Sequence, residues 1–330
     1  MPFDTTLTII CTAFNAAQRT QELTEHLGEI LTTSPKVEVV VVDDASTDQT
    51  WQALEQFQRG LSTHDRARLA LIQNEQNRGL AAARNTGMQH ASGRYVCFLD
   101  DDDALILASL RGLLTILATT TSDLMTVNVV EESDAGERRL THPLLSDDMP
   151  PAAFFQRAVE RGTLLTPAWA YLYSRHFIDR CAWQFPDGWI HEDCWSTPTA
   201  LLRAQSICQF SQPFYRYRRR AGSLTLNDSP VRLQQRAQDL MNICEALFSE
   251  HPTCPVFARS ALLARQFDLL AYACSITSPA PASALAQRAH ALKIRLLSER
   301  PAWRILQWTP TLFLKQKHLR RVRDSLKAVR

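Results

Sequence analysis

The sequence lacks a stretch of about 20 apolar residues, the length that a helix needs to cross a bilayer. Its N-terminus has neither the basic start nor the long apolar core of a secretory signal. The eight cysteines form no C-x-x-C pair, which argues against a zinc site. We therefore expect a protein of the reducing cytoplasm, and any contact with a membrane to be peripheral.

Two phosphate-binding motifs are also missing. The first apolar run leads into CTAFNAAQRT and not into a G-x-G-x-x-G turn, which disfavours a nicotinamide oxidoreductase. A nucleotidyltransferase would carry a glycine-rich phosphate loop at the same place, and that loop is absent as well. Other nucleotide-using classes stay open.

At 330 residues the chain is about twice the length of a typical domain, so we expect one large domain with additions or two units. Hydrophobic residues make up 45% and charged residues 21%, which is ordinary for a globular protein. The formal net charge of +2 hides a basic C-terminal end and says little about partners. No nucleic-acid partner is expected.

The first half of the chain alternates short β-branched runs with longer helical stretches, the pattern of βαβ units that form a mostly parallel sheet. An alanine-rich helix is expected over 79–93, with Gly93 at its C-terminal end. From about residue 230 onward apolar residues recur at helical spacing. Strands are expected over 7–14, 37–43, 68–73, 94–99 and 123–132.

Four consecutive carboxylates, Asp100 to Asp103, follow the fourth expected strand. Two like charges 4 Å apart repel by about 1 kcal/mol even in water, so the run favours an opposing charge. A hard cation such as Mg²⁺ or Mn²⁺ is one candidate, with Asp100 and Asp102 turned towards the same point. The alternative is a solvated loop in which Asp103 caps the following helix.

A second acidic pair, Asp43 and Asp44, ends the second expected strand. Carboxylates there could accept hydrogen bonds from a nucleobase or from ribose hydroxyls. The alternative is a turn that starts a helix, and it explains Ser46 and Asp48 better than it explains Asp44. Because ligands of open α/β sheets bind at the carboxyl ends of strands, both acidic segments are expected on one rim.

Four segments occur in order along the chain, namely TAFN, VVDDASTDQT, NRGLAAARNTGMQHASGRY and FLDDDD. Together they resemble glycosyltransferase family 2, whose members are inverting enzymes. Two later segments, HEDCWSTPTALLRA and YRYRRRAGSLT, extend the resemblance over roughly residues 5–225. It implies an α/β protein of the GT-A fold, a Rossmann-like, mostly parallel sheet flanked by helices with a C-terminal helical extension.

The resemblance also implies a division of the chain. A GT-A domain is expected over 1–228, with its nucleotide-sugar half at about 1–130 and its acceptor half at about 131–228. A helical region over 229–330 follows.

Roles for individual residues follow from the same resemblance. Asp102, with Asp100, would hold Mn²⁺ or Mg²⁺. Asp193 would be the general base, with Glu192 beside it. Trp189 and His191 would contact the acceptor. The nucleotide-sugar would be bound by Thr12, Phe14, Asn15, Asp43, Asp44, Arg84, Asp100, Asp101 and Arg220.

The chain departs from the family at two of these places. Many relatives have a proline in the first motif, where this chain has Thr12. Many carry a histidine in the late motif, where this chain has Arg220. An arginine cannot ligate a metal, but it can bind phosphate oxygens through two hydrogen bonds.

The last 30 residues combine aromatic and aliphatic side chains with many lysines and arginines. Such a segment could lie on the anionic cytoplasmic face of the inner membrane, or it could be a solvated basic helix or a homodimer contact.

The expected function is metal-dependent transfer of a sugar, from a donor expected to be UDP-linked, to a cell-surface glycan or a lipid-linked glycan precursor. The alternative is a non-catalytic relative that binds the nucleotide-sugar as an assembly partner.

Overall fold

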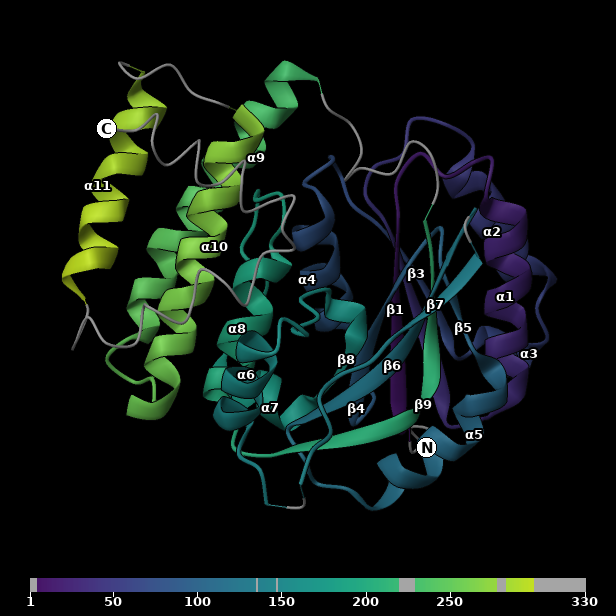
Figure 1. Cartoon of the computed structure of the whole chain (residues 1–330). Coiled ribbons are helices and arrows are strands. Elements are labelled where there is room, and N and C mark those ends of the chain that lie inside the picture. The colour runs from purple at the N-terminus through teal and green to yellow at the C-terminus, as the bar shows by residue number, and fades with distance from the viewer. Residues whose placement is uncertain (1–4, 135, 147, 220–228, 278–282, 300–330) are drawn as a thin grey trace. The chain divides into compact units, whose positions relative to one another are not determined.

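The computed structural model describes residues 5–134, 136–146, 148–219, 229–277 and 283–299 (Figure 1). The chain folds into two compact units. The first comprises Met1–His142, Pro167–Gly188 and Ala204–Arg220, and the second comprises Pro143–Thr166, Trp189–Arg203 and Ala221–Arg330.

In the described part of the chain, nine strands of the first unit form one sheet in the order β3-β2-β1-β4-β8-β6-β9-β5, with β7 paired to β6. The pairs among β1, β2, β3 and β4 are parallel, as is β6 with β9, while β8 runs antiparallel to β4 and β6. The strands are β1 (Leu7–Ala13), β2 (Val37–Asp43), β3 (Leu69–Gln73), β4 (Tyr95–Asp100), β5 (Ala104–Leu105), β6 (Leu124–Ser133), β7 (Gly136–Leu140), β8 (Tyr171–Ser174) and β9 (Ile207–Arg218).

The five strands expected from the sequence are confirmed to within one residue at each end. Every residue of β1 is buried, and β2 is buried except for the half-buried Glu38. A parallel strand that is covered on both faces needs an apolar side chain at almost every position, because neither face meets water. The apolar run of β2 therefore reflects its place inside the sheet, between β1 and β3.

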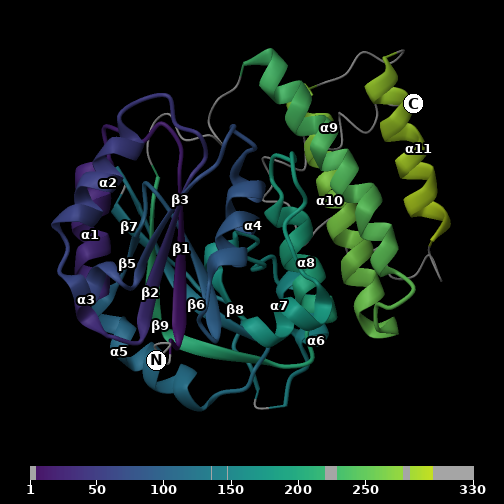
Figure 2. The same ribbon diagram turned by 180° about the vertical axis from the view of Figure 1, so that it is seen from behind.

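Helices cover both faces of this sheet (Figures 1 and 2). The helix α4 packs on β1 and β2 from one side, while α1 packs on β2 and contacts α2 and α5 on the other side. The helices and the 3-10 turn of this unit are α1 (Thr20–Thr33), α2 (Thr50–Gly60), α3 (Thr63–Arg66), α4 (Leu80–His90), α5 (Leu107–Thr119), η1 (Ala168–Ala170) and α7 (Arg175–Cys181).

The expected role of Gly93 at the end of a helix is wrong. The helix α4 ends at His90, and its C-cap is Ala91 in an extended conformation. Gly93 lies further on, against β1, where an added Cβ atom would come within 2.6 Å of the backbone nitrogen of Thr8. This glycine is therefore required by the close approach of two backbones and not by the end of a helix.

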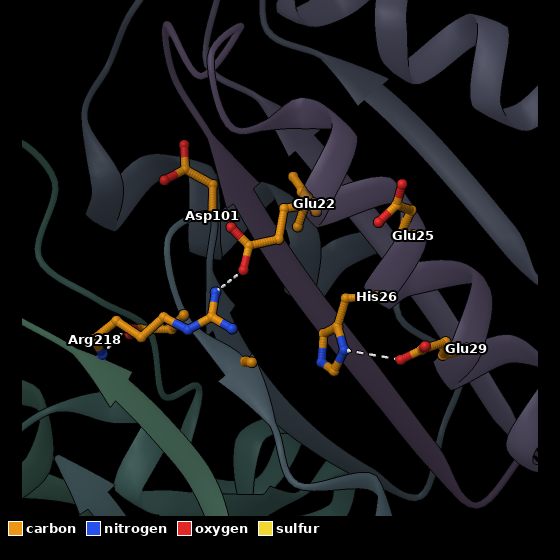
Figure 3. Close-up of a pocket in the computed structure, with 9 residues that line it drawn as sticks. Glu22, Glu25, His26, Glu29, Asp101 and Arg218 are labelled. Atoms are coloured by element: carbon orange, nitrogen blue, oxygen red, sulfur yellow. Dashed lines mark hydrogen bonds and ion pairs between the residues drawn. The ribbon is translucent and has the colours of Figure 1, made fainter. Parts of the chain in front are cut away.

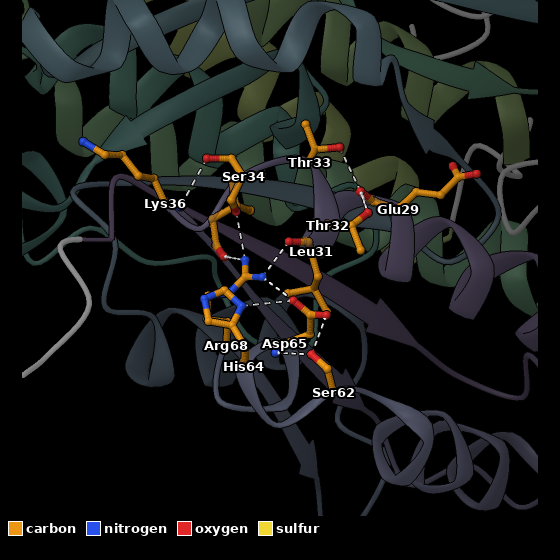
Figure 4. Close-up of polar contacts among 11 residues, drawn as sticks. Glu29, Leu31, Thr32, Thr33, Ser34, Lys36, Ser62, His64, Asp65 and Arg68 are labelled. Atoms are coloured by element: carbon orange, nitrogen blue, oxygen red, sulfur yellow. Dashed lines mark hydrogen bonds and ion pairs between the residues drawn. The ribbon is translucent and has the colours of Figure 1, made fainter.

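The buried side chain of Arg68 completes the C-terminal end of α1, as Figure 4 shows. Its Nη2 donates to the carbonyl of Leu31 at 2.6 Å, and its Nη1 donates to the carbonyls of Ser34 and Val37 at 2.8 Å. Asp65 pairs with the same guanidinium at 2.6 Å. The last carbonyls of a helix have no partner within the helix, so a distant arginine supplies the donors here.

The second unit is helical in its described residues. Its elements are α6 (Pro151–Glu160), α8 (Asp193–Arg203), α9 (Pro230–Ala246), η3 (Leu247–Glu250), η4 (Val256–Ala258), α10 (Arg259–Thr277) and α11 (Ala284–Ser298). The expectation of C-terminal helices is confirmed for this part of the chain. None of the helices that the structure describes is both long and apolar enough to span a bilayer. The basic segment after residue 300 lies outside the described residues.

Candidate active site

The carboxyl ends of β1, β2 and β4 lie side by side, because β1 is paired in parallel with both neighbours. Thr12 faces Val42 on one side and Asp100 on the other in the strand register. The two acidic segments therefore lie on the same rim of the sheet, as the sequence predicted. Thr12 itself is buried, with 7% of its surface exposed.

The loop after β1 is joined to the loop after β2. Asn15 has a left-handed backbone with a φ of 47°, and its side-chain oxygen accepts a 2.9 Å hydrogen bond from the amide of Thr47. Its own amide donates to the hydroxyl of Ser46 at 2.9 Å. Phe14 is 44% exposed next to this junction, which is unusual for so large an apolar side chain. An exposed ring here is available to contact a ligand.

The carboxylate of Asp43 closes the turn after β2. It accepts hydrogen bonds from the amide and the hydroxyl of Ser46 and, at 3.2 Å, from the side chain of Gln73. The residue is fully buried. Its expected contact with the nucleotide-sugar stays a prediction.

Asp44 organises the start of α4. One oxygen accepts from the amide of Gly79 at 2.7 Å, and the other accepts from the side chain of Asn74 at 2.7 Å. The amide of Arg78 donates to both oxygens at 3.1 and 3.2 Å. Gly79, with a φ of 85°, immediately precedes the helix. Asp44 therefore binds the amides at a helix N-terminus, where a negative charge is favoured.

Arg84 lies inside the protein with 1% of its surface exposed. Its Nη2 donates to Asp100 Oδ1 at 2.9 Å, and its guanidinium lies 5.7 Å from the ring centre of Phe98 and 5.4 Å from that of Phe185. A cation over two aromatic faces is stabilised where water cannot reach it. Arg84 thus binds Asp100, the first carboxylate of the acidic run, from the core of the protein.

Asp101 has a different partner. Both of its oxygens accept from Nη2 of Arg19, at 3.0 and 3.1 Å, and Arg19 is the residue that precedes α1. Burial raises the pKa of Asp101 to about 6, while the charge of Arg19 acts in the opposite direction. Sequence reasoning missed Arg19, whose only signal is a single basic side chain after the first motif.

Asp103 does not cap the following helix, so that expectation is wrong. The helix α5 begins at Leu107, and its N-cap is Ile106. The carboxylate of Asp103 instead accepts from the hydroxyl of Tyr215 at 2.7 Å and from the amide of Arg218 at 2.8 Å. Burial and the nearby charge of Asp100 raise the pKa of Asp103 above its ordinary value.

Tyr215 is held in turn by an aromatic stack. Its ring lies 4.6 Å from that of Trp169 with an angle of 5° between the planes, and Tyr217 stacks on the same tryptophan at 5.5 Å. Sequence reasoning noticed the arginines of this strand and not its tyrosines. Two of those arginines, Arg216 and Arg218, pair with glutamates, and Arg220 lies outside the described residues.

A pocket of about 190 Å³ lies beside the acidic run (Figure 3). In Figure 3 Glu22 pairs with Arg218, and His26 lies towards Glu29 at 3.7 Å. The pocket is smaller than the roughly 300 Å³ and more that small-molecule ligands usually occupy, so it is not the size of a nucleotide-sugar site. Its lining residues are Glu22, Leu23, Glu25, His26, Glu29, Asp101, Asp103, Ala104 and Arg218.

Within the part of the chain that the structure describes, no three His, Cys, Asp or Glu side chains lie where they could together hold a metal ion. Magnesium sites in phosphate-transferring proteins commonly use one or two carboxylates, and the substrate phosphates complete the coordination. Asp100 and the half-buried Asp102 supply hard oxygen ligands of that kind. The donor set therefore fits a cation that is bound together with a diphosphate.

The expected base belongs to the second unit. Asp193 is the first residue of α8. Glu192 is buried, with 5% of its surface exposed, and its carbonyl accepts from the amides of Trp195 and Ser196 at 3.0 and 2.9 Å. These bonds form the first turn of the helix and direct the backbone at Asp193.

The residues expected to contact an acceptor precede this helix. Trp189 is half-buried, and His191 has a left-handed backbone with a φ of 67°. The Nε2 atom of His191 accepts from Nε of Arg236 at 3.2 Å. Burial lowers the pKa of His191 to about 4, and the charges of Arg236 and Arg265 act in the same direction. The imidazole is therefore neutral at neutral pH.

Comparison with known proteins identifies relatives of this chain. The model of the family described as glycosyl transferase family 2 matches residues 8–179. Glycosyltransferase GlyA of Streptococcus pneumoniae is 28% identical over 235 residues, which cover 68% of this chain and 32% of GlyA. The poly(ribitol-phosphate) beta-N-acetylglucosaminyltransferase TarS of Staphylococcus aureus is 28% identical over 217 residues, which cover 63% of this chain and 35% of TarS. The chain thus spans about a third of the length of these relatives.

Solved structures show the same fold. A fragment of S. aureus TarS in complex with UDP-GlcNAc superposes with a TM-score of 0.67 at 19% identity, covering 98% of this chain and 89% of that one. The mannosyltransferase PcManGT of Pyrobaculum calidifontis, in complex with GDP-Man and Mn²⁺, has a TM-score of 0.54 at 20% identity and covers 98% of this chain and 90% of its own. The mixed sheet with flanking helices therefore has the GT-A fold.

Proposed function

Because the chain belongs to glycosyltransferase family 2, we propose that it transfers a sugar from a UDP-linked donor to a hydroxyl group, with inversion at the anomeric carbon. The acceptor is a bacterial cell-surface glycan or its lipid-linked precursor. The observation that carries this proposal is the rim formed by the ends of β1, β2 and β4, where Asp44 and the acidic run from Asp100 to Asp103 lie together.

A divalent cation, Mn²⁺ or Mg²⁺, would be held by Asp102 with Asp100, and when bound it would neutralise the charge that develops on the departing diphosphate. The protein prepares this end of the site through its own contacts. Arg84 directs Asp100 from the core, and Arg19 and Tyr215 direct the carboxylates on either side of Asp102. Because three carboxylates are already oriented by protein donors, less reorganisation is needed when the donor substrate binds.

Asp193 is proposed as the general base. It accepts the proton of the acceptor hydroxyl while that oxygen forms a bond to the anomeric carbon. The bond between the anomeric carbon and the diphosphate oxygen breaks, and its electron pair leaves with the diphosphate. A single displacement of this kind inverts the configuration, and a carboxylate within hydrogen-bond reach of the hydroxyl is what it requires. Glu192 is proposed to support the base.

The nature of the substrates is supported by the names of relatives. TarS was crystallised with UDP-GlcNAc and is named for a poly(ribitol-phosphate) acceptor. The E. coli glucosyltransferase WfaP, 28% identical over 113 residues covering 34% of this chain and 41% of WfaP, is named for UDP-Glc and a diphosphoundecaprenol-linked GlcNAc. A UDP-sugar and a glycan on a phosphate-containing carrier are therefore the first substrates to test. A lipid carrier would place the reaction at the cytoplasmic face of the membrane.

The test measures release of nucleoside diphosphate from UDP-, GDP- and dTDP-sugars, with Mn²⁺ or Mg²⁺ and with EDTA. Undecaprenyl-diphosphate-linked GlcNAc and a ribitol-phosphate polymer serve as acceptors. We expect turnover with a UDP-sugar that depends on acceptor and is lost with EDTA. A relative that uses one of these acceptors serves as the positive control. If this chain binds a nucleotide-sugar but shows no turnover where the relative does, it is a non-catalytic binding protein.

A further inference from the structure

The helix α9 holds the segment Trp189–Asp193 through a buried carboxylate. Asp239 has 2% of its surface exposed, and its Oδ2 accepts a 3.1 Å hydrogen bond from the backbone amide of Ile190. Its Oδ1 accepts from the side chains of Gln235 at 3.0 Å and Asn242 at 3.4 Å, one turn away on either side. The carboxylate is therefore oriented by its own helix before it meets the segment.

A second contact from α9 reaches the next residue of the segment. Arg236 is 3% exposed, and besides its bond to His191 its Nη2 donates to the hydroxyl of Tyr272 on α10 at 3.2 Å. The rings of Tyr272 and His191 meet edge to face at 6.4 Å. Arg265, also on α10, donates to the sulfur of Cys194 at 3.3 Å. Residues on both sides of Asp193 are thus bound by the C-terminal helices.

The backbone of this segment needs such support. His191 adopts a left-handed conformation that costs energy for any residue with a Cβ atom, and conformations of this kind persist only where surrounding contacts determine them. They are concentrated at functional sites. Here the left-handed residue lies two positions before Asp193, at the point where the chain turns into α8.

We propose that α9 positions the proposed base, with Asp239 and Arg236 as the positioning residues. The inference rests on the proposed function in one respect, namely that Asp193 is the base. It gives the C-terminal helices a part in catalysis, because the direction of the Asp193 side chain is set by the segment that these helices bind. Neither Asp239 nor Arg236 contacts the reacting atoms in this scheme.

The test is a double-mutant cycle in the full chain with Asp239→Ala, Asp193→Asn and the double variant. Asp239→Ala should lower kcat at least tenfold, where kcat is calculated from the concentration of protein that binds nucleotide. The KM for the donor should stay within twofold of the wild-type value. Asp239→Asn keeps an acceptor oxygen and should restore most of the rate. In the Asp193→Asn background the same alanine change should have little further effect, because residues that act through one group are not additive.

The matched control is Glu245→Ala on the same helix, which removes an ion pair with Arg288 of α11 and leaves the segment untouched. It should keep the wild-type kcat. Hydrogen exchange provides a readout that does not depend on activity. The amides of Ile190 and His191 should exchange faster in Asp239→Ala than in Glu245→Ala.

Several outcomes would overturn the proposal and can be told apart. Equal loss from Asp239→Ala in both backgrounds would show that Asp239 does not act through Asp193. Unchanged exchange at Ile190 would show that Asp239 does not hold the segment. In both cases the proposed function would stand. A wild-type rate for Asp193→Asn would instead remove the base assignment of the proposed function, and this inference with it.

Discussion

Arg84 Nη2 lies 2.9 Å from Asp100 Oδ1, and the two side chains meet at the boundary between the core and the rim of the sheet. The arginine is 1% exposed, whereas the aspartate side chain is 26% exposed. Such an asymmetric pair has two different consequences when it is broken, because a charge left in the core loses more hydration than a charge left at the surface.

Removing Asp100 should therefore destabilise the protein more than removing Arg84. Asp100→Asn takes the charge of Asp100 away from the buried guanidinium, and we expect a loss of about 3 kcal/mol, the lower end of the range for broken buried pairs. Arg84→Met leaves a carboxylate that water still reaches, and its cost should be smaller. Urea unfolding of both variants measures the order, and the reverse order would contradict the structure.

The metal and the base should be separable by mutation. Asp102→Ala should remove the part of nucleotide binding that depends on Mn²⁺, because the coordinating oxygen is lost. Asp193→Asn should keep that binding and lower the transfer rate by roughly a hundredfold to ten-thousandfold, the usual contribution of a general base. Calorimetric titration with UDP in the presence and absence of Mn²⁺ measures the first effect, and a turnover assay measures the second. Metal-dependent UDP binding that survives Asp102→Ala would rule out the proposed ligand.

The hydroxyl of Tyr215 should help to orient the carboxylates of the acidic run, through its hydrogen bond to Asp103. Tyr215→Phe removes the hydroxyl that donates to the 6% exposed Asp103, and taking the donor from a buried acceptor costs about 1 to 3 kcal/mol. Thermal or urea unfolding measures this cost. We also expect weaker Mn²⁺-dependent nucleotide binding, since Asp102 lies next to Asp103. The matched control is Tyr217→Phe, which keeps both the stack on Trp169 and the bond to Asp103. Equal effects of the two substitutions would argue against the role of the hydroxyl.

His142 should make the first unit less stable in mild acid. Its Nε2 lies 3.2 Å from the carbonyl of Ala170, its ring meets Tyr171 edge to face at 4.9 Å, and burial lowers its pKa to about 4. The pKa of histidine in an unfolded chain is about 6.5, so between these values the unfolded chain binds more protons. The free energy of unfolding should therefore fall as the pH falls through this interval, by up to about 1.4 kcal/mol per pH unit.

The variant His142→Phe isolates this contribution, because phenylalanine keeps an aromatic ring at this position and cannot take up a proton. The unfolding free energy of the wild type minus that of the variant should fall as the pH is lowered from 7 to 5. Subtracting the variant removes the contribution of carboxylates with shifted pKa values, such as Asp101. A difference that is constant with pH would show that His142 does not titrate in this way.

The elements of this protein follow closely from local sequence. The apolar run of β2 and the alternation of strands with helices predicted five of the nine described strands to within one residue at each end, because periodicity and burial act within a few residues. The placement of Asp44 and the acidic run on one rim follows from the same strands, since parallel strands end on the same side. The motifs also identified the family, which the match over residues 8–179 shows.

Only the tertiary structure decided which partners Asp101, Asp103 and the amide of Ile190 take. Asp101 pairs with a residue 82 positions away, Asp103 with one 112 positions away, and Ile190 with one 49 positions away. The wrong expectations, a cap at Asp103 and a helix end at Gly93, both assumed a neighbour in sequence where the contact is with a distant segment. Local patterns specify backbone conformation, because that depends on nearby residues. The choice of partner depends on which strands and helices the folded chain brings together, and no single segment of the sequence determines that arrangement.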